Sequence, residues 1–278
     1  MAKVKKFESP SDFLDYNEET LKAQYFEHFH VHRLFIDLSE GKERLYDAYN
    51  IIDDDDSNII LIWVEQLFFI YSSKWNADLL DLLENQLTQI EARPLLLRGS
   101  KKLILELMEK MKLEYEMIND RIIYDCDAVN PFTRQPKGKL GVAVINDIPS
   151  ILKMSANYYL EEFEGKGQQS YESVQESAYQ GVLNSKIYKW SNNGLIVSMA
   201  RLLSGSPDNV MIGGLFTKTN ERKKGYAYFL VSELTQQLLN EGAVKCGLLT
   251  EVTKIATNKI FEKTGYNKVY EWVNILLK

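Results

Sequence analysis

The sequence predicts a two-domain α/β protein (α+β, with a mixed β-sheet). Three observations support this class. The 278 residues exceed one typical domain and suit two domains of ordinary size. A hydrophobic content of 45% is enough to bury a core. Short runs rich in Ile, Val and Phe alternate along the chain with stretches of helical periodicity.

The N-terminal half alternates between helical and extended patterns. Spaced leucines indicate an amphipathic helix that Pro94 ends, and Gly99-Ser100 precedes another helix. The expected elements are helices up to about residue 48, one or two strands over 59–71, a helix over 79–90, a strand over 95–97, a helix over 101–111 and strands around a turn over 118–124.

A polar segment with Pro131, Pro136 and Gly138 divides the two halves. We therefore expect an N-terminal domain over 1–130, a linker over 131–139 and a second domain over 140–278. Asn192-Asn193-Gly194 predicts a hairpin in the second domain. The other expected elements there are strands over 140–145, 210–217, 246–250 and 268–277, and helices from about 147 to 162, 170 to 184, 226 to 240 and 255 to 263.

Charge and cysteine usage exclude several classes of protein. A net charge of −6 argues against a general nucleic-acid binder, which needs a basic face. Two cysteines make no disulfide framework, and the sequence contains no signal peptide and no apolar run long enough to span a membrane. We expect a soluble, cytoplasmic protein that binds no nucleic acid and no membrane.

Three alternating histidines form a candidate metal-ligating pattern. His28, His30 and His32 would share one face of a strand, but the surrounding pattern is helical and spreads them around the axis. The sequence therefore predicts no metal site.

The most informative segment joins a predicted strand to a predicted helix, from Gly213 to Ala227. Its turn contains Arg222, Lys223, Lys224 and Gly225. A helix N-terminus presents unpaired backbone N–H groups and the positive end of the helix dipole, and glycine lets a ligand approach the backbone. These features favour binding of a pyrophosphate. The glycine patterns of dinucleotide-binding and nucleoside-triphosphate loops are absent.

This turn resembles the Arg/Gln-x-x-Gly-x-Gly/Ala motif of the GNAT superfamily of N-acetyltransferases. Segment 250–266, which ends in Gly265-Tyr266, resembles the second cofactor motif of that family, and 187–200 is similar to the hairpin before it. The resemblance covers the chain from about Leu140 onward. It implies a GNAT-like acyl-CoA N-acyltransferase fold there, and the N-terminal half is similar to a diverged partner domain that has lost the cofactor turn.

The resemblance also implies roles for individual residues. The turn would bind the pyrophosphate of acetyl-CoA, the edge of the preceding strand would pair with the pantetheine arm, and a backbone N–H near Phe216 would polarise the thioester carbonyl. Divergence of the strands over 210–217 and 246–250 would open a slot for the thioester. The expected contacts are Leu215, Phe216, Thr217, Arg222, Lys223, Lys224, Gly225, Tyr226, Ala227, Asn258 and Phe261; for Asn258, a role as an anchor of the backbone stays open.

The proton-transfer groups are less defined. Many family members carry a tyrosine where this chain has Phe261, so another group must protonate the departing thiolate, or the thiolate leaves unprotonated. Tyr226, Tyr228 and Tyr266 are substitutes in principle, although packing roles explain them equally well. Glu251 is the first candidate general base, followed by carboxylates at the end of the first helix of this domain, which are Glu161, Glu162 and Glu164.

Three functions remain open at this stage. The leading one is acetyl transfer from acetyl-CoA to a primary amine of a small molecule or peptide, by direct attack in a ternary complex without a metal. The second is a noncatalytic acyl-CoA-binding regulatory module, favoured by Phe261. The third is transfer of a longer acyl group. The sequence identifies no acceptor, and it leaves open whether the N-terminal half shapes the acceptor pocket or a homodimer surface.

Overall fold

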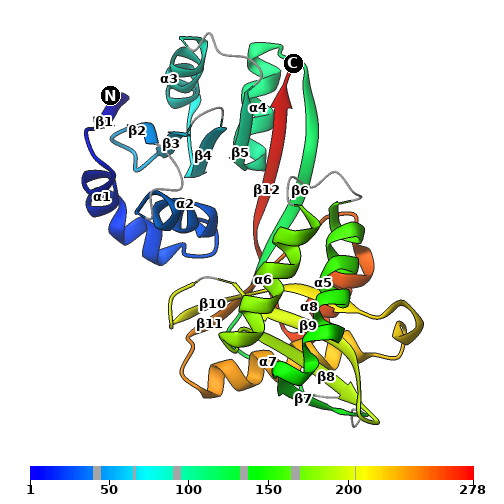
Figure 1. Ribbon diagram of the computed structural model, residues 1–278. Coiled ribbons are helices and arrows are strands. Elements are labelled where there is room, and N and C mark those ends of the chain that lie inside the picture. The colour runs from blue at the N-terminus through cyan, green and yellow to red at the C-terminus, as the bar shows by residue number, and fades with distance from the viewer. Residues whose placement is uncertain (40–44, 65–66, 90–94, 132–136, 164–169, 204) are drawn as a thin grey trace. The chain divides into compact units, whose positions relative to one another are not determined.

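We describe the protein from a computed structural model, which covers residues 1–39, 45–64, 67–89, 95–131, 137–163, 170–203 and 205–278. The chain forms two compact units. Unit 1 comprises Met1–Ile123, Glu251–Thr253 and Val269–Lys278, and unit 2 comprises Tyr124–Thr250 and Lys254–Lys268. Figure 1 colours both units along the chain.

Unit 1 is built on a mixed sheet in the strand order β1-β2-β3-β4-β5-β12, with β6 next to β12. Parallel pairing joins β4 to β5, whereas β1–β2, β2–β3, β3–β4 and β5–β12 are antiparallel. The strands and helices are β1 (Lys3–Phe7), α1 (Pro10–Ala23), α2 (Phe29–Ser39), β2 (Leu45–Ile52), β3 (Asn58–Val64), β4 (Leu67–Lys74), α3 (Ala77–Thr88), β5 (Leu96–Ser100), α4 (Lys101–Met111), β6 (Tyr115–Cys126) and β12 (Asn267–Leu277).

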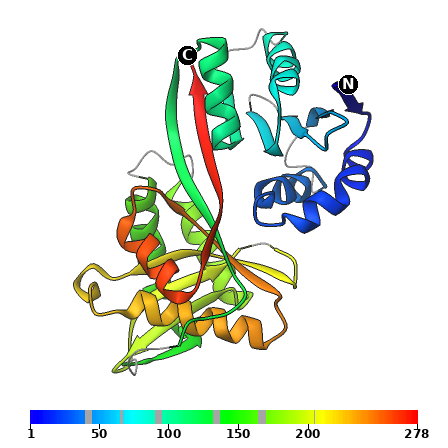
Figure 2. The ribbon, with the colours of Figure 1, turned by 180° about the vertical axis from the view of Figure 1, so that it is seen from behind.

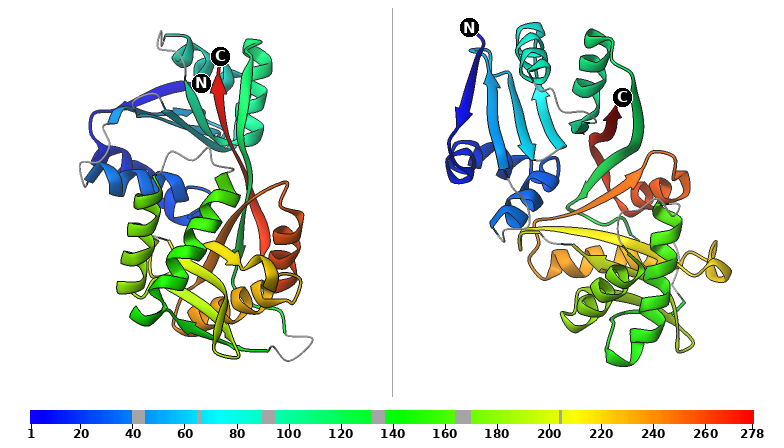
Figure 3. Two further views of the ribbon diagram at one scale, coloured as in Figure 1. Left: turned by 45° about the vertical axis from the view of Figure 1, so that its right-hand side comes forward. Right: turned by 45° about the horizontal axis from the view of Figure 1, so that its top comes forward.

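The sheet of unit 1 is covered on both faces because its central strands are apolar on both sides. Ile59 and Leu61 of β3 pack into a core with α3 and α4, whereas Ile60 and Ile62, which alternate with them, are equally buried on the other face. Contacts such as the hydrogen bond between the Asn17 and Asn50 side chains place α1 on that second face. Figure 3 shows helices on both sides of this sheet.

Unit 2 contains the second part of the mixed sheet, ordered β7-β8-β9-β10-β11, with the end of β6 beside β11. The hairpin predicted at Asn193-Gly194 is confirmed between β8 and β9, and β10 pairs with β11 in parallel. The remaining elements are β7 (Lys139–Val142), the short helix η1 (Ile145–Asp147), α5 (Ile148–Phe163), α6 (Tyr171–Leu183), β8 (Ile187–Asn192), β9 (Leu195–Leu202), β10 (Asn209–Thr217), η2 (Thr219–Glu221), α7 (Tyr226–Asn240), β11 (Lys245–Glu251) and α8 (Ile255–Thr264).

Helices cover both faces of this part of the sheet as well. Ile151 and Met154 of α5 pack with α6 and with Met199 and Phe216 of the sheet in one core. On the opposite face, Trp190 of β8 stacks on Phe229 of α7, with ring centroids 6.0 Å apart. Figures 1 and 2, which view opposite sides, show α5 and α6 on one side and α7 and α8 on the other.

Two expectations for the N-terminal half were wrong. The first 48 residues are not helical throughout, because β1 and the start of β2 lie among them. The turn expected at Asn119-Asp120 is instead part of the continuous strand β6. The polar side chains that suggested a turn find partners within the sheet: Asn119 donates to Glu251 at 2.9 Å, and Asp120 accepts from the Lys101 ammonium at 2.8 Å.

The compact units also differ from the expected domains of 1–130 and 140–278. Unit 2 starts at Tyr124, and Val269–Lys278 belongs to unit 1. The reason is β12, which pairs with β5 from Trp272↔Ser100 to Leu276↔Leu96 and buries Val273, Ile275 and Leu277 in the N-terminal core. A strand rich in apolar residues is stabilised by either core, so its sequence does not reveal which sheet it joins.

Candidate functional site

Strands β10 and β11 of unit 2 pair over only part of their lengths. Parallel pairing runs from Asn209↔Lys245 to Ile212↔Leu248. Beyond it, β10 continues to Thr217 and β11 to Glu251. The pairing therefore stops in the middle of both strands. Main-chain groups of β10 beyond Ile212 face a position where an extended ligand could take the place of the neighbouring strand.

A bulge in β10 begins where this pairing ends. On the β9 side, Gly213 is opposite Arg201 but Phe216 is opposite Met199, so β10 has an extra residue between the two pairs. Gly214 in the bulge has φ = 58°, a left-handed conformation that glycine adopts without steric cost. The bulge redirects the main chain of β10 beside the slot.

The hydrogen-bonding direction beyond the bulge identifies which N–H groups face the slot. Lys218 donates its backbone N–H to Val197 of β9. N–H directions alternate along a strand, so the N–H of Phe216 points to β9 and that of Thr217 points away from it, to the slot. The carbonyl of Thr217 lies on the same side and accepts from Arg222 Nε at 3.0 Å. The Thr217 N–H is therefore the main-chain donor at this strand end that faces the slot.

The turn after β10 leads into α7 through two residues with positive φ, Lys223 at 63° and Gly225 at 91°. The N–H of Phe229 bonds to the Gly225 carbonyl and closes the first turn of the helix. The N–H groups of Tyr226 and Ala227 precede this bond and point out of the helix end, together with the positive end of the helix dipole. This arrangement fits the pyrophosphate site that the sequence predicts.

Two of the three basic side chains of the turn, those of Arg222 and Lys224, are paired with acids. The guanidinium of Arg222 donates to both carboxylate oxygens of Glu161 on α5, at 2.8 and 2.6 Å, and lies 5.4 Å from the Phe216 ring centroid. Lys224 forms an ion pair with Glu221 at 2.8 Å. The main chain of the turn therefore offers the more direct contacts to a phosphate, and Arg222 also holds α5 against the end of β10.

Asn258 and Phe261 of α8 are buried, and both contact Tyr124 at the end of β6. The Tyr124 hydroxyl donates to Asn258 Oδ1 at 2.7 Å, and the Asn258 amide donates to the Lys254 carbonyl at 3.1 Å. The Phe261 ring packs edge-on against Tyr124, with centroids 5.6 Å apart. Asn258 thus anchors the backbone, the alternative that the sequence left open.

Tyr124 is a residue that sequence reasoning missed. Its ring packs against that of Phe261, which lacks a hydroxyl, and burial raises the pKa of Tyr124 to about 12. The hydroxyl is therefore neutral at physiological pH and able to donate a proton. No signal in the sequence joins residues 124 and 261, because β6 and α8 meet only in the folded unit.

Comparison with known proteins connects this geometry to a family. Residues 151–266, which run from α5 to the residue after Gly265, match the model of the acetyltransferase (GNAT) family. The chain carries a GNAT domain. No curated protein matches the sequence.

Solved structures resemble the chain beyond the GNAT domain. An acetyltransferase of the GNAT family from Colwellia psychrerythraea is 11% identical, with a TM-score of 0.60 over 99% of this chain and 100% of its own. A Drosophila protein is 13% identical, with a TM-score of 0.61 over 99% and 98%. A GCN5-related N-acetyltransferase from Sphaerobacter thermophilus is 14% identical, with a TM-score of 0.54 over 83% and 80%. At these identities the likeness is one of fold.

The acidic candidates around the GNAT domain differ in their surroundings. Both oxygens of Glu251 are engaged, by the Asn119 amide at 2.9 Å, the Asp120 N–H at 3.1 Å and Arg121 Nε at 2.6 Å. Glu161 pairs with Arg222. Glu162 is partly exposed at the end of α5, and Glu164 lies outside the described residues. Glu251 and Glu161 are both ion-paired carboxylates, and Glu162 stays a candidate.

The three candidate tyrosines of the GNAT domain have structural contacts. The Tyr226 hydroxyl accepts from the Asn192 amide at 2.8 Å. Tyr266 is buried, and its hydroxyl lies 2.7 Å from Thr235 Oγ1. The ring of Tyr228 lies under the Lys263 ammonium, 4.4 Å from its centroid. These contacts favour packing roles for all three.

Unit 1 has no equivalent of the phosphate turn in its described part. There, α4 starts at Lys101 directly after β5, without an intervening loop. Gly99 instead allows β5 to lie close to the adjacent β4, because a Cβ at this position would lie 1.9 Å from the Ile70 carbonyl oxygen. Arg98 faces the aromatic rings of Phe69 and Trp272.

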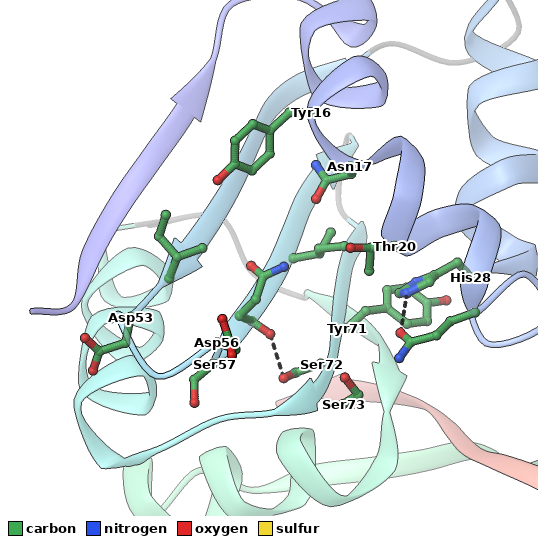
Figure 4. Close-up of a pocket in the computed structure, with 14 residues that line it drawn as sticks. Tyr16, Asn17, Thr20, His28, Asp53, Asp56, Ser57, Tyr71, Ser72 and Ser73 are labelled. Carbon is green, nitrogen blue, oxygen red and sulfur yellow. Dashed lines mark hydrogen bonds between the residues drawn. The ribbon is translucent and has the colours of Figure 1, made fainter.

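A polar pocket of about 440 Å³ lies in unit 1 between α1 and the strands β3 and β4 (Figure 4). Its charged lining residues are the carboxylates Asp53 and Asp56, and its one imidazole is that of His28. Burial lowers the pKa of His28 to about 4 and keeps its ring neutral at physiological pH. The described residues that line the pocket include no Lys or Arg to pair with a pyrophosphate.

The histidines of unit 1 take different partners. His28 lies 3.3 Å from Gln24, His30 stacks on Trp272, and His32 bonds to the Leu21 carbonyl. Within the described ranges, no three His, Cys, Asp or Glu side chains are arranged to hold a metal ion, and no helix is long and apolar enough to cross a membrane.

Proposed function

We propose that the protein transfers an acetyl group from acetyl-CoA to a primary amine. The observation that carries this proposal is that two features of unit 2, the slot beside β10 and the turn before α7, lie next to each other. The slot where β10 leaves β11 opens beside the strand end that leads directly into the phosphate turn of α7. Acetyl-CoA has a matching order of parts, because its amide-containing arm joins a pyrophosphate to an activated thioester.

Different residues of unit 2 would bind different parts of acetyl-CoA. N–H groups at the start of α7, from Gly225 to Ala227, receive the pyrophosphate. Main-chain groups of Leu215 to Thr217 pair with the pantetheine amides in place of a neighbouring strand. The N–H of Thr217 points to the slot and would polarise the thioester carbonyl as negative charge develops on its oxygen.

The chemical step is a direct attack in a ternary complex. The amine nitrogen forms a bond to the acetyl carbon as the carbon–sulfur bond breaks, and the electron pair leaves on the CoA thiolate. The acceptor ammonium first loses a proton to Glu162 or to water, because only the neutral amine has the lone pair that attacks. After the attack the nitrogen loses a second proton to water as the amide forms, and the thiolate takes a proton from water or from Tyr124. Phe261 supplies no proton and packs against Tyr124.

Unit 1 is proposed to be a diverged partner domain that binds no CoA. The absence of a phosphate turn after β5 in the described residues and the acidic lining of its pocket support this. The buried, free thiols of Cys126 and Cys246 support a reducing location such as the cytoplasm.

Calorimetry with CoA tests the site. Gly225→Val and Arg222→Glu should each weaken binding by about 10–150-fold, the equivalent of a lost charge-assisted contact of about 1.5–3 kcal/mol. Gly194→Val is the matched control, since Gly194 also has a positive φ (77°) but lies in the β8–β9 turn, where an added Cβ would meet no atom within 4 Å. Equal affinity in the two site variants and the parent would place the phosphate site elsewhere.

Thiol release in the presence of amines separates the alternatives. Release from acetyl-CoA with an amine present is expected for the acetyltransferase. CoA binding without release for any amine indicates a binding module, and faster release from longer acyl-CoA thioesters indicates a different acyl donor.

A further inference from the structure

A small cavity of about 100 Å³ lies in unit 2 next to the bulge of β10. Side chains of α5 and α6 line it from one direction, and β9 and Gly214 of the bulge line it from the other. Much of the wall is apolar or aromatic: Met199 is buried, and the rings of Tyr159 and Phe163 lie 4.8 Å apart. The cavity shares the bulge with the proposed acyl slot, so a molecule within it lies next to the reacting thioester.

Arg201 is the one charged group among the described residues that line this cavity. It lies on β9, paired with Ile187 of β8 and Gly213 of β10. Its Nη1 donates to Ser177 Oγ at 3.0 Å. Its Nε is shielded from solvent and has no acceptor in the described part of the chain, and no salt bridge found there pairs a carboxylate with Arg201.

A partly buried guanidinium without a counter-ion loses part of its hydration. Burial lowers the pKa of Arg201, a direction opposed by Tyr158, because removal of water disfavours the charged form. An anion next to the guanidinium would replace the lost hydration. Among the described residues the fold thus places a partly desolvated cation at the cavity without an anionic partner.

Gly214 provides the space for the arginine stem. A Cβ at Gly214 would lie 3.1 Å from Arg201 Cγ and 3.2 Å from Cδ, closer than ordinary van der Waals contact. A side chain at this position would require the Arg201 stem to shift by a few tenths of an ångström. The bulge thus borders the slot and also leaves room for the Arg201 side chain.

We propose that this cavity binds a carboxylate of the acceptor, so that the acceptor is a primary amine that also carries a carboxylate on a small apolar body. This proposal rests on the proposed acetyl transfer. A guanidinium donates parallel hydrogen bonds that match the geometry of a carboxylate, and the ion pair is strong in a site with little water. The aromatic wall then contacts the apolar body while the amine reaches the thioester.

Product analogues test the proposal without requiring turnover. N-acetyl derivatives of alanine, leucine and phenylalanine are titrated into the full chain in the presence of CoA, alongside the corresponding N-acetyl amino-acid amides. The two members of each pair differ in the charge of one group. We expect at least one free acid to bind at least tenfold more tightly than its amide; equal or weaker binding by all three acids overturns the proposal.

Two substitutions assign the effect to Arg201. Arg201→Gln should abolish the preference for the acid while binding of the amide changes less than threefold. Arg201→Lys should retain part of the preference, since the charge remains but the planar fork is lost. Lys153→Gln removes an exposed charge of α5 and should leave the preference unchanged. A preference that survives Arg201→Gln, with CoA binding and the fold intact, also overturns the proposal.

A second set of matched pairs, amino acids and their decarboxylated amines, separates this proposal from the proposed function in kinetic assays. With free amines, wild type should acetylate an amino acid with a higher kcat/KM than its decarboxylated counterpart, and Arg201→Gln should raise KM for the amino acid with little change in kcat. Acetylation of both without preference refutes the carboxylate site alone. If CoA does not bind, acetyl transfer is refuted, whether or not the N-acetyl amino acids bind.

Discussion

The neutral, buried His28 should make unit 1 sensitive to acid. Only 4% of the residue is exposed, and its ring packs edge-on against Tyr71, with centroids 5.3 Å apart. Its Nε2 lies 3.3 Å from the Gln24 oxygen, and its Nδ1 has no partner in the described part of the chain. Burial, with a smaller effect of His32, lowers the pKa of His28 to about 4.

The size of the effect follows from proton linkage. In the unfolded chain the histidine pKa is about 6.5, above that in the folded unit, so the unfolded chain binds the proton more readily below this pH. The stability contribution is complete above about pH 6.5 and is lost as the pH falls toward about 4. Between pH 7 and pH 5, His28 alone should reduce the free energy of unfolding by about 2 kcal/mol.

Hydrogen exchange at increasing urea concentration measures this loss separately for each unit. Peptides from β3 and β4 report on unit 1, and peptides from β8 and β9 are an internal reference, because all three histidines of the chain lie at 28, 30 and 32. His28→Phe keeps an aromatic ring against Tyr71 but cannot titrate. The His28→Phe variant should lose about 2 kcal/mol less of the free energy of unfolding of unit 1 between pH 7 and pH 5 than wild type does.

Burial also lowers the pKa of His30, to about 3, with smaller effects of Arg98 and Arg121, so some acid sensitivity should remain in the His28 variant. If His28→Phe and wild type lose the same stability between pH 7 and pH 5, the folded pKa of His28 is not depressed and the reasoning is refuted.

Two further predictions concern unit 2. Phe261→Tyr should change turnover by less than the roughly 10²–10⁴-fold of a working general acid, because Tyr124 or water can protonate the thiolate; a hundredfold rise with a new alkaline limb in the pH–rate profile would show that the missing hydroxyl matters. Gly265→Ala should destabilise unit 2 by at least about 1–3 kcal/mol, since φ is 117° and the new Cβ would lie 2.6 Å from the Ala128 carbonyl oxygen. Gly242→Ala is the control, because Gly242 has a φ of 111° but an added Cβ there would meet no atom within 4 Å, so this variant measures the backbone strain alone. If thermal unfolding shows the same loss of stability in both variants, the clash at Gly265 does not contribute.

Secondary structure was most predictable where local periodicity and capping agree. The predicted helices over 101–111 and 226–240 match α4 and α7 at both ends. Prediction failed at β1, β2 and β6, where polar or mixed residues occur in strands. In β6 the polar pair Asn119-Asp120 is satisfied by Glu251 and Lys101, residues distant in the sequence, so local chemistry suggested a turn.

The candidate site was predictable in part for the same reason. The turn from Arg222 to Ala227 is a contiguous segment whose backbone conformation depends on its own glycine and on the helix that follows. The pairing of Arg222 with Glu161 and the contact of Tyr124 with Phe261 were not predictable. Each joins residues from elements that only the packed unit brings together.

The sequence by itself determined most of the helices, the hairpin at Asn193-Gly194, the basic turn before α7 and the resemblance to the GNAT family, because these depend on periodicity and on short contiguous motifs. Tertiary structure decided where β10 separates from β11, that the N–H of Thr217 faces the slot, and that the Arg201 side chain lies against Gly214. It also decided that β12 completes the sheet of unit 1. Strand pairing and burial are properties of segments far apart in the chain, so no local pattern records them.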